Sequence, residues 1–319
     1  MKAMMICANT RELLTTEKEI HGVVHSVFQK VCNIEIQTGE IIPLIAHGMP
    51  KVPRCITVKI PTEQTMHSLG FKTRTAVVIH NDLIRTMDRG PQLDFQEAVI
   101  WDGKPGFPHM PLEEQYVLEN IARLRKIILE KGRLSGLGAI LFLADKDLRG
   151  MPYPEELQMN TYCEFIGPRI MKLIEQILKG NLREIEDMAK QIIGFGLGLT
   201  PSADDLLAGM MTAMIYGDHY YGRELTETLK INQAIIQDAA HRTTKISAEM
   251  LLFAAMGEAA ENIGQLMKAI FYEKSEKSIY QNAISVIDNG DTSGTDCIAG
   301  IYAGCILSQI KAREGGWSV

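Results

Sequence analysis

Hydrophobic positions change their spacing about a third of the way along the chain. Up to residue 101 they form short runs rich in β-branched residues, separated by glycines and polar turns. Runs bounded in this way are typical of β-strands. The predicted strands occupy residues 23–36, between Gly22 and Gly39, and residues 41–46, 55–60, 75–79 and 98–101.

From residue 112 onward the apolar residues recur with the period of a helix. One face of the first such segment carries Tyr116, Leu118, Ile121, Leu124, Ile127 and Ile128. Further helices are predicted over residues 136–144, 155–179, 182–193, 204–216, 224–240, 247–260, 263–271, 279–287 and 296–311. Regular alternation of strands and helices is absent, which argues against a doubly wound parallel sheet.

A proline- and glycine-rich stretch, residues 102–108, separates the two patterns. Clusters of these residues interrupt regular structure and indicate a linker. The expected fold class is therefore α+β. We expect a β-rich N-terminal domain of residues 1–108, followed by a mostly α-helical domain of residues 109–319.

Composition narrows the classes of protein to consider. The 319 residues, 46% hydrophobic and 23% charged, fit a soluble globular protein. A net charge of −6 argues against nucleic-acid binding through bulk charge. No apolar run reaches the ~18 residues of a membrane span. The six cysteines are scattered with no CxxC pair, so we expect no metal site of that kind and buried thiols in a reducing cytoplasm.

The most informative motif places three glycines, Gly194, Gly196 and Gly198, before Thr200-Pro201 and an apolar helical pattern. Glycine permits a positive φ and the close approach of a ligand. Thr200 as N-cap, followed by proline at the first helical position, is a strong helix start. Backbone N–H groups then converge on a helix N-terminus, a common place to bind small anions. The motif follows a helix and lacks a lysine, so neither a dinucleotide fingerprint nor a P-loop fits. A tight turn between helices is the alternative.

Two adjacent carboxylates, Asp204 and Asp205, occupy the first turn of this helix. The helix dipole favours acidic residues there, which is the simplest interpretation. Two carboxylates repel a bare phosphate, however, so a functional role implies a metal ion or the N–H donors of an amide, ureido or carbamoyl group. Neighbouring residues on a helix point about 100° apart. We therefore expect only one of the pair to face a ligand.

The pattern S-[AG]-x-D-x-[LI]-A-G occurs twice, at residues 202–209 and 293–300. It aligns Ser202 with Ser293 and Asp205 with Asp296, and both copies open a predicted helix. The echo predicts two helix N-termini that face one pocket, with chance similarity as the alternative. The Ala-Gly pair in each copy would let the two helices pack closely.

A third polar segment covers residues 241–247. Arg242 has the geometry to hold a phosphate or carboxylate in bidentate fashion, and Thr244 and Ser247 share one face of a helix. A solvated helix end with hydroxyl caps is the alternative interpretation.

These three segments resemble the motifs of the AllH-like family. The first matches G-x-G-x-G-L-T-P-S-G-D-D, with Ala203 where the family has glycine, a position we expect to be helical. The second matches T-x-x-S-x-x-x-L from Thr244, and the third matches S-S-G-x-D-x-x-x-G with Thr292 in place of the first serine. Members of the family are similar to a subunit of oxamate carbamoyltransferase, which converts oxalurate and phosphate to oxamate and carbamoyl phosphate in anaerobic allantoin use.

The resemblance implies a small anionic substrate and a hetero-oligomer with FdrA-like and AllG-like subunits. The catalytic candidates are Ser202, Asp204, Asp205 and Asp296. The substrate-binding candidates are Gly194, Gly196, Gly198, Thr200, Arg242, Thr244, Ser247, Ser293 and Gly294. No cofactor or protein-bound metal is predicted with certainty, and a water-bound Mg²⁺ is an alternative partner for the carboxylates. Two other functions remain open, a non-catalytic scaffold or regulatory subunit and a stand-alone enzyme acting on another ureido or amide substrate.

Overall fold

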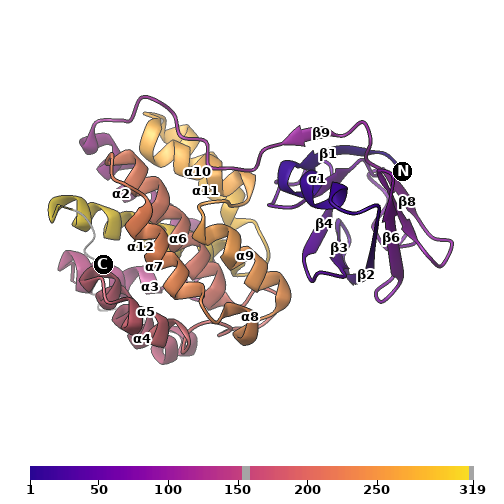
Figure 1. Cartoon of the computed structure of the whole chain (residues 1–319). Helices are drawn as coiled ribbons and strands as arrows, with labels where there is room; N and C mark the ends of the chain where they lie inside the picture. The colour runs from indigo at the N-terminus through magenta and orange to yellow at the C-terminus, as the bar shows by residue number, and fades with distance from the viewer. Residues whose placement is uncertain (153–158, 316–319) are drawn as a thin grey trace. The chain divides into compact units, whose positions relative to one another are not determined.

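The computed structural model describes residues 1–152 and 159–315. The chain divides into two compact units, Met1–Lys104 and Pro105–Val319, so the division falls within the proline- and glycine-rich stretch. The first unit is a curled sheet and the second is built from helices, which confirms the α+β fold class (Figure 1).

The first unit contains one nine-stranded sheet with the order β8-β7-β6-β2-β3-β4-β5-β1-β9. Its strands are β1 (Ala3–Cys7), β2 (Glu19–Val27), β3 (Val31–Ile36), β4 (Ile41–Ala46), β5 (Ile56–Val58), β6 (Ala76–His80), β7 (Leu83–Thr86), β8 (Gln92–Asp94) and β9 (Val99–Trp101). The pairs β1–β9 and β4–β5 are parallel, and the other pairs are antiparallel. A short helix, α1 (Ala8–Thr15), follows β1.

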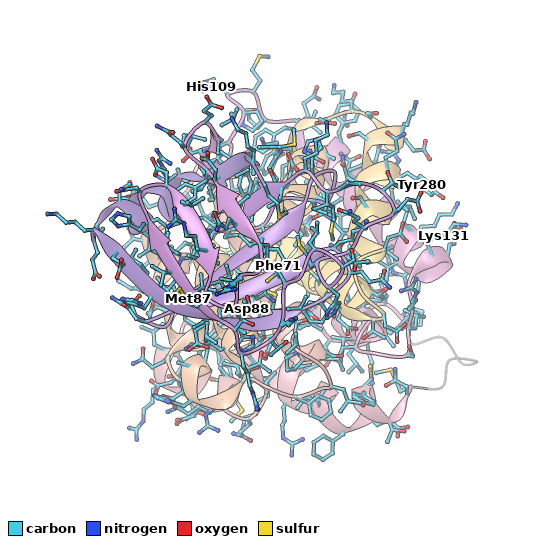
Figure 2. All side chains as sticks on the ribbon, turned by 90° about the vertical axis from the view of Figure 1, so that its right-hand side faces the viewer. Phe71, Met87, Asp88, His109, Lys131 and Tyr280 are labelled. Atoms are coloured by element: carbon cyan, nitrogen blue, oxygen red, sulfur yellow. The ribbon has the colours of Figure 1, made fainter. Side chains whose placement is uncertain are left out.

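The strand prediction was right for the long apolar runs and incomplete for the short ones. The predicted strand at 41–46 is β4, and the run at 23–36 is the β2–β3 hairpin. The sequence did not predict β1, α1, β7 or β8, because elements of three to eight residues carry little periodicity. Phe71 belongs to the buried hydrophobic cluster that forms the core of this unit and is 2% exposed, whereas Met87, in the turn after β7, is 63% exposed (both are labelled in Figure 2).

The helical unit follows the predicted succession of helices. Its elements are α2 (Glu114–Lys131), α3 (Ile140–Arg149), α4 (Thr161–Lys179), α5 (Leu182–Ala189), α6 (Ser202–Tyr220), α7 (Thr226–Ile236), α8 (Ala239–Arg242), α9 (Lys245–Ala255), α10 (Glu261–Tyr272), α11 (Glu276–Ile287) and α12 (Ser293–Arg313). No helix in these described ranges is both long and apolar enough to cross a membrane.

Several of the predicted helices differ in their bounds from the observed ones. The segment 182–193 ends as a helix at Ala189, and the segment 204–216 is part of a longer helix, Ser202–Tyr220. The segment 224–240 divides into α7 and α8. The segment 136–144 begins as a turn, and α3 starts only at Ile140. The segment 247–260 ends as a helix at Ala255. The predicted start of a helix at residue 155 lies outside the described residues.

Two long helices, α6 and α12, form the centre of the helical unit, with other helices around them (Figure 1). They are parallel, because Leu206 lies against Gly300 and Met210 lies against Gly304. A Cβ atom added at Gly300 would lie 1.9 Å from the carbonyl oxygen of Leu206. This contact shows that the small residues of the repeated pattern let the two backbones touch. The N-termini of α6 and α12 are therefore neighbours.

Candidate functional site

The N-cap of the first helix of the pair lies one residue later than the sequence predicts. Pro201, not Thr200, is the N-cap of α6, with φ −55° and ψ 144°. The carbonyl of Pro201 accepts the N–H groups of Asp204 and Asp205 at 2.9 and 3.1 Å. The prediction of Thr200 as N-cap was therefore wrong. Its hydroxyl instead lies 3.3 Å from the hydroxyl of Ser293 at the start of α12.

All three glycines of the loop adopt positive φ, at 83°, 127° and 95°. Gly194 is also pressed against the backbone, because a Cβ there would lie 2.2 Å from the carbonyl oxygen of Arg242. At Gly196 a Cβ would lie 2.4 Å from the amide nitrogen of Ser202. Gly198 has open space around it, so only its backbone conformation requires glycine. The loop folds back onto its own helix, since the N–H of Ala203 donates to the carbonyl of Phe195 at 3.0 Å. Ala203 itself is helical, as expected.

The two adjacent aspartates have different surroundings. Asp204 is fully buried, and its oxygens accept from the Gly194 N–H at 2.8 Å and the Ser247 hydroxyl at 2.6 Å. The hydroxyl of Thr243 also donates to it. Burial raises the pKa of Asp204, and these three donors oppose the rise. Asp204 therefore ties the glycine loop to the α8–α9 segment.

Asp205 and Asp296 are instead each influenced by hydroxyl groups of the opposite helix. The hydroxyls of Ser293 on α12 and of Thr200 before α6 lower the pKa of Asp205 on α6, and the hydroxyl of Ser202 on α6 lowers the pKa of Asp296 on α12. Each serine of the repeated pattern thus favours the charged form of the aspartate of the other copy.

Both of these carboxylates keep one oxygen without a partner. Asp205 is 5% exposed and Asp296 is 0% exposed, and within the described ranges the Oδ2 atom of each has no hydrogen-bond partner. Burial raises the pKa of Asp205 well above its usual range, and the charge of Asp296 adds to the rise. Burial likewise raises the pKa of Asp296 to about 6. The site therefore holds two carboxylates that bind a proton more tightly than an ordinary aspartate does.

The raised pKa of Asp296 predicts a specific pH dependence of stability. An unfolded aspartate has a pKa of about 3.9, so folding takes up a proton between about pH 4 and pH 6. The stability that comes from this tighter proton binding in the folded state is fully present below about pH 4 and is lost as the pH rises through about 6. Asp296→Asn removes the titration. We expect the variant to gain on the order of 1–3 kcal/mol relative to wild type between pH 4.5 and 7.5.

Urea unfolding of both proteins across this range measures the effect. The difference between the two free energies of unfolding matters, because other groups titrate equally in both. A difference that stays constant with pH would show that Asp296 titrates in the folded chain as it does in the unfolded chain.

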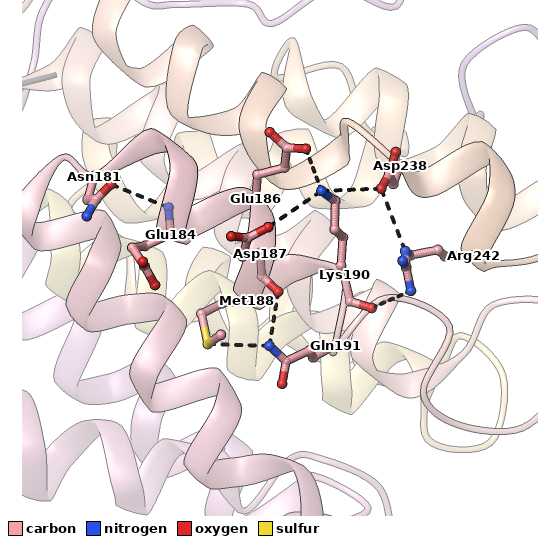
Figure 3. A network of polar contacts seen from close by, with 9 residues as sticks. All are labelled: Asn181, Glu184, Glu186, Asp187, Met188, Lys190, Gln191, Asp238 and Arg242. Atoms are coloured by element: carbon pink, nitrogen blue, oxygen red, sulfur yellow. Dashed lines mark hydrogen bonds and ion pairs between the residues drawn. The ribbon is translucent and has the colours of Figure 1, made fainter.

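The predicted segment 241–247 supports the loop. Thr244 is the N-cap of α9, accepting the Ser247 N–H at 3.1 Å, and its hydroxyl donates to the carbonyl of Leu199. The guanidinium of Arg242 donates to the carbonyl of Lys190 at 3.0 Å and lies 3.9 Å from Asp238 (Figure 3). Thr244, Ser247 and Arg242 are thus engaged in contacts within the fold.

The second helix start has its own support. A Cβ at Gly294 would lie 2.0 Å from the carbonyl oxygen of Val286, so this glycine lets α12 approach the end of α11. Arg133 donates its backbone N–H to the hydroxyl of Thr295 at 2.9 Å. Its guanidinium donates to the carbonyls of Gly290 and Asp291 at 2.7 and 2.8 Å. The loop before α12 is therefore held in place from the end of α2.

Sequence reasoning missed the third wall of the site, the turn that precedes α3. The N–H of Leu137 donates to Asp296 Oδ1 at 2.6 Å. A Cβ at Gly136 would lie 2.5 Å from the same oxygen, so only glycine leaves room for the carboxylate. The side chain of Asn160 donates to the carbonyls of Leu134 and Gly136. The glycines at 136 and 138 were the only available signal.

The chemistry open to this site is that of hydroxyls and carboxylates. Burial raises the pKa of the neighbouring Cys163 to about 12, which disfavours a thiolate nucleophile. Within residues 1–152 and 159–315 no three His, Cys, Asp or Glu side chains gather as metal ligands. A Mg²⁺ ion here would take its other ligands from water or substrate. The arrangement can bind N–H donors and transfer protons.

These observations define the class of protein. It is an α+β protein of two units, and the helical unit carries a polar site of serines and aspartates where two parallel helices begin. Residues 192–305 match the family model of the oxamate carbamoyltransferase subunit AllH, and residues 2–100 match the AllH family N-terminal domain. The chain belongs to the AllH family. The first match covers the glycine loop, α6 and the start of α12. No solved structure matches the chain.

Proposed function

We propose that this chain supplies an amide- and anion-binding site to an oxamate carbamoyltransferase-like enzyme. One observation carries the proposal: Asp205 and Asp296 each keep a buried, unpartnered oxygen where two helices begin. A buried polar atom without a partner costs about 1–3 kcal/mol. A fold that keeps two such atoms, on carboxylates that act on each other electrostatically, favours a ligand that supplies the missing N–H donors.

The proposed ligand carries an NH₂ group and a negative charge. The positive ends of the α6 and α12 dipoles attract a carboxylate or phosphate. The half-buried hydroxyls of Thr200 and Ser293 face the same region, 3.3 Å apart. Asp205 and Asp296 accept hydrogen bonds from the amide or carbamoyl NH₂. Oxalurate, oxamate and carbamoyl phosphate all combine these features.

The proposed reaction transfers the carbamoyl group from oxalurate to phosphate. A phosphate oxygen bonds to the carbamoyl carbon while the C–N bond to the oxamate nitrogen breaks. That nitrogen takes up a proton, and hydrogenphosphate loses one. Burial raises the pKa of Asp205 well above its usual range, which favours a carboxyl that can give and take a proton in this reaction. It delivers the proton through the hydroxyl of Ser293 and regains one from hydrogenphosphate.

FdrA-like and AllG-like subunits are the proposed partners, within a cytoplasmic complex that uses allantoin nitrogen. The family description names a subunit, which supports assembly with other chains.

Calorimetric titration of the full chain tests the site without partners. We expect heat of binding with carbamoyl phosphate or oxamate. Asp296→Asn should weaken the affinity about 10- to 100-fold, because one carboxylate acceptor becomes an amide. Asp187→Asn is the matched control: Asp187 lies on α5, half-exposed and 3.6 Å from Lys190, and its loss should leave binding unchanged.

The alternative function is that of a non-catalytic scaffold or regulatory subunit. It is supported by Asp204, Arg242, Thr244 and Ser247, whose side chains all make hydrogen bonds to other residues of the fold. A scaffold or regulatory subunit would bind none of the ligands, yet would restore activity when mixed with its partners. That pair of results would overturn the binding proposal. Turnover by the isolated chain would instead indicate a stand-alone enzyme.

A further inference from the structure

Asn160, immediately before α4, makes an unusual set of bonds for a helix cap. Its side-chain oxygen accepts the Cys163 N–H at 2.9 Å, which is ordinary N-capping. Its amide nitrogen donates to two further carbonyls, those of Leu134 at 2.6 Å and Gly136 at 2.7 Å. Both N–H groups of the Asn160 amide thus donate hydrogen bonds to the backbone of the same turn, residues 134–136. The side chain joins the start of α4 to the turn before α3.

The clamped turn reaches the candidate site directly. Leu137, the next residue, donates its N–H to Asp296 Oδ1 at 2.6 Å, and the backbone of Gly138 adds to the same carboxylate. The thiol of Cys163 donates to the Gly136 carbonyl at 3.4 Å, which reinforces the clamp. A shift of this turn would move the only backbone donors that hold Asp296 among the described residues.

We propose that Asn160 is a positioning residue, which fixes the 134–138 turn so that Asp296 keeps its orientation and its proton affinity. Its functional consequence rests on the proposed role of Asp296 in ligand binding; the positioning itself does not. A hydrogen bond to a carboxylate favours the charged form, so weakening the Leu137 bond raises the pKa of Asp296.

Other groups also act on the same carboxylate. Asp205 on α6 and Cys163 on α4 couple to it electrostatically, as does Cys297 on α12. Arg133, at the other end of the turn, directs its guanidinium to the Gly290 and Asp291 carbonyls. Substitution at 160 leaves all of these groups in the chain, so the turn is the main variable.

Asn160→Ser tests the proposal, because serine keeps the capping oxygen but loses both N–H donors. Asn181→Ser is the matched control: Asn181 caps α5 through the Glu184 N–H at 3.4 Å, and in the part of the chain that the structure describes its side chain makes no hydrogen bond to the site. Carboxyl titration by NMR of ¹³C-labelled full chain follows Asp296, assigned by its loss in Asp296→Asn. We expect the midpoint to rise by about 0.5–1 pH unit in Asn160→Ser and not in Asn181→Ser.

The outcomes separate the two proposals. An unchanged midpoint in a folded Asn160→Ser variant overturns the positioning role, whatever the chain binds. A raised midpoint, with a pH profile of ligand binding that shifts in parallel, supports both proposals. A raised midpoint with an unshifted binding profile keeps the positioning role and removes Asp296 from the binding site.

Discussion

Gly300→Ala is expected to unfold the helical unit at temperatures where the wild type is folded. The added Cβ would lie 1.9 Å from the carbonyl oxygen of Leu206 and 3.0 Å from its Cα. Both contacts are backbone, which cannot turn aside as a flexible side chain would. The two helices must therefore separate where their buried backbones touch. Overpacking of this kind costs more than about 3 kcal/mol.

Urea or thermal unfolding followed by circular dichroism measures this loss. Gly264→Ala, in α10, is the matched control, because it makes the same chemical change inside a helix with space available. Its Cβ would lie 3.7 Å from the nearest atom, the Tyr216 hydroxyl. Alanine is a better helix former than glycine, so this variant should be equally stable or gain up to about 1 kcal/mol. Equal stability of both variants would contradict the close contact of α6 and α12.

The central helix pair shows what a sequence pattern can predict. The repeated S-[AG]-x-D-x-[LI]-A-G carries its own structural logic, since small residues permit close packing and a polar start follows from the helix dipole. The structure places the two copies side by side, with Ser202 and Ser293 directed to the opposite aspartates. Apolar residues all round α6 and α12 agree with their central position.

The sheet shows where such prediction stops. β8 has three residues and β7 has four, and their order depends on pairing with each other and with β6. Long-range pairing leaves no local period in the sequence. The parallel pairing of β1 with β9 joins residues more than ninety positions apart and is equally invisible in a local pattern.

The site itself could be predicted only in part. The repeated pattern pointed to Asp205 and Asp296 as a pair. Because neighbouring helix positions point about 100° apart, we expected only one of Asp204 and Asp205 to face a ligand. Which one was undetermined, because the answer depends on Thr243 and Ser247, some forty residues later. Asn160 falls inside the helix predicted over residues 155–179, whereas in the structure it is the N-cap of α4. Its two bonds to the 134–136 turn are tertiary contacts, which leave no local pattern in the sequence.

The two neighbouring aspartates allow a structural role, that of Asp204, to be distinguished experimentally from a role in the proposed reaction, that of Asp205. Asp205→Asn should leave the fold intact and lower turnover of the assembled enzyme about 10²- to 10³-fold. Asparagine is neutral, as burial favours at this position, and it keeps an oxygen close to Ser293 and Thr200. The variant lacks the proton and the N–H acceptor that Asp205 supplies in the proposed reaction. Steady-state turnover with oxalurate and phosphate, in the complex with its partner subunits, measures the effect.

Asp204→Asn, one residue earlier, is the matched comparison and should show the opposite result. One oxygen of its carboxylate accepts from the Gly194 N–H, and the other accepts from the hydroxyls of Thr243 and Ser247. Asparagine replaces one of the two oxygens by an NH₂ group, which cannot accept a hydrogen bond. We expect a loss of about 1–3 kcal/mol in stability, with turnover largely retained at low temperature. Full activity in Asp205→Asn would remove this carboxyl from the reaction. Equal loss of turnover in both variants, with both folded, would instead assign the two aspartates a single shared role, against the division that their hydrogen bonds indicate.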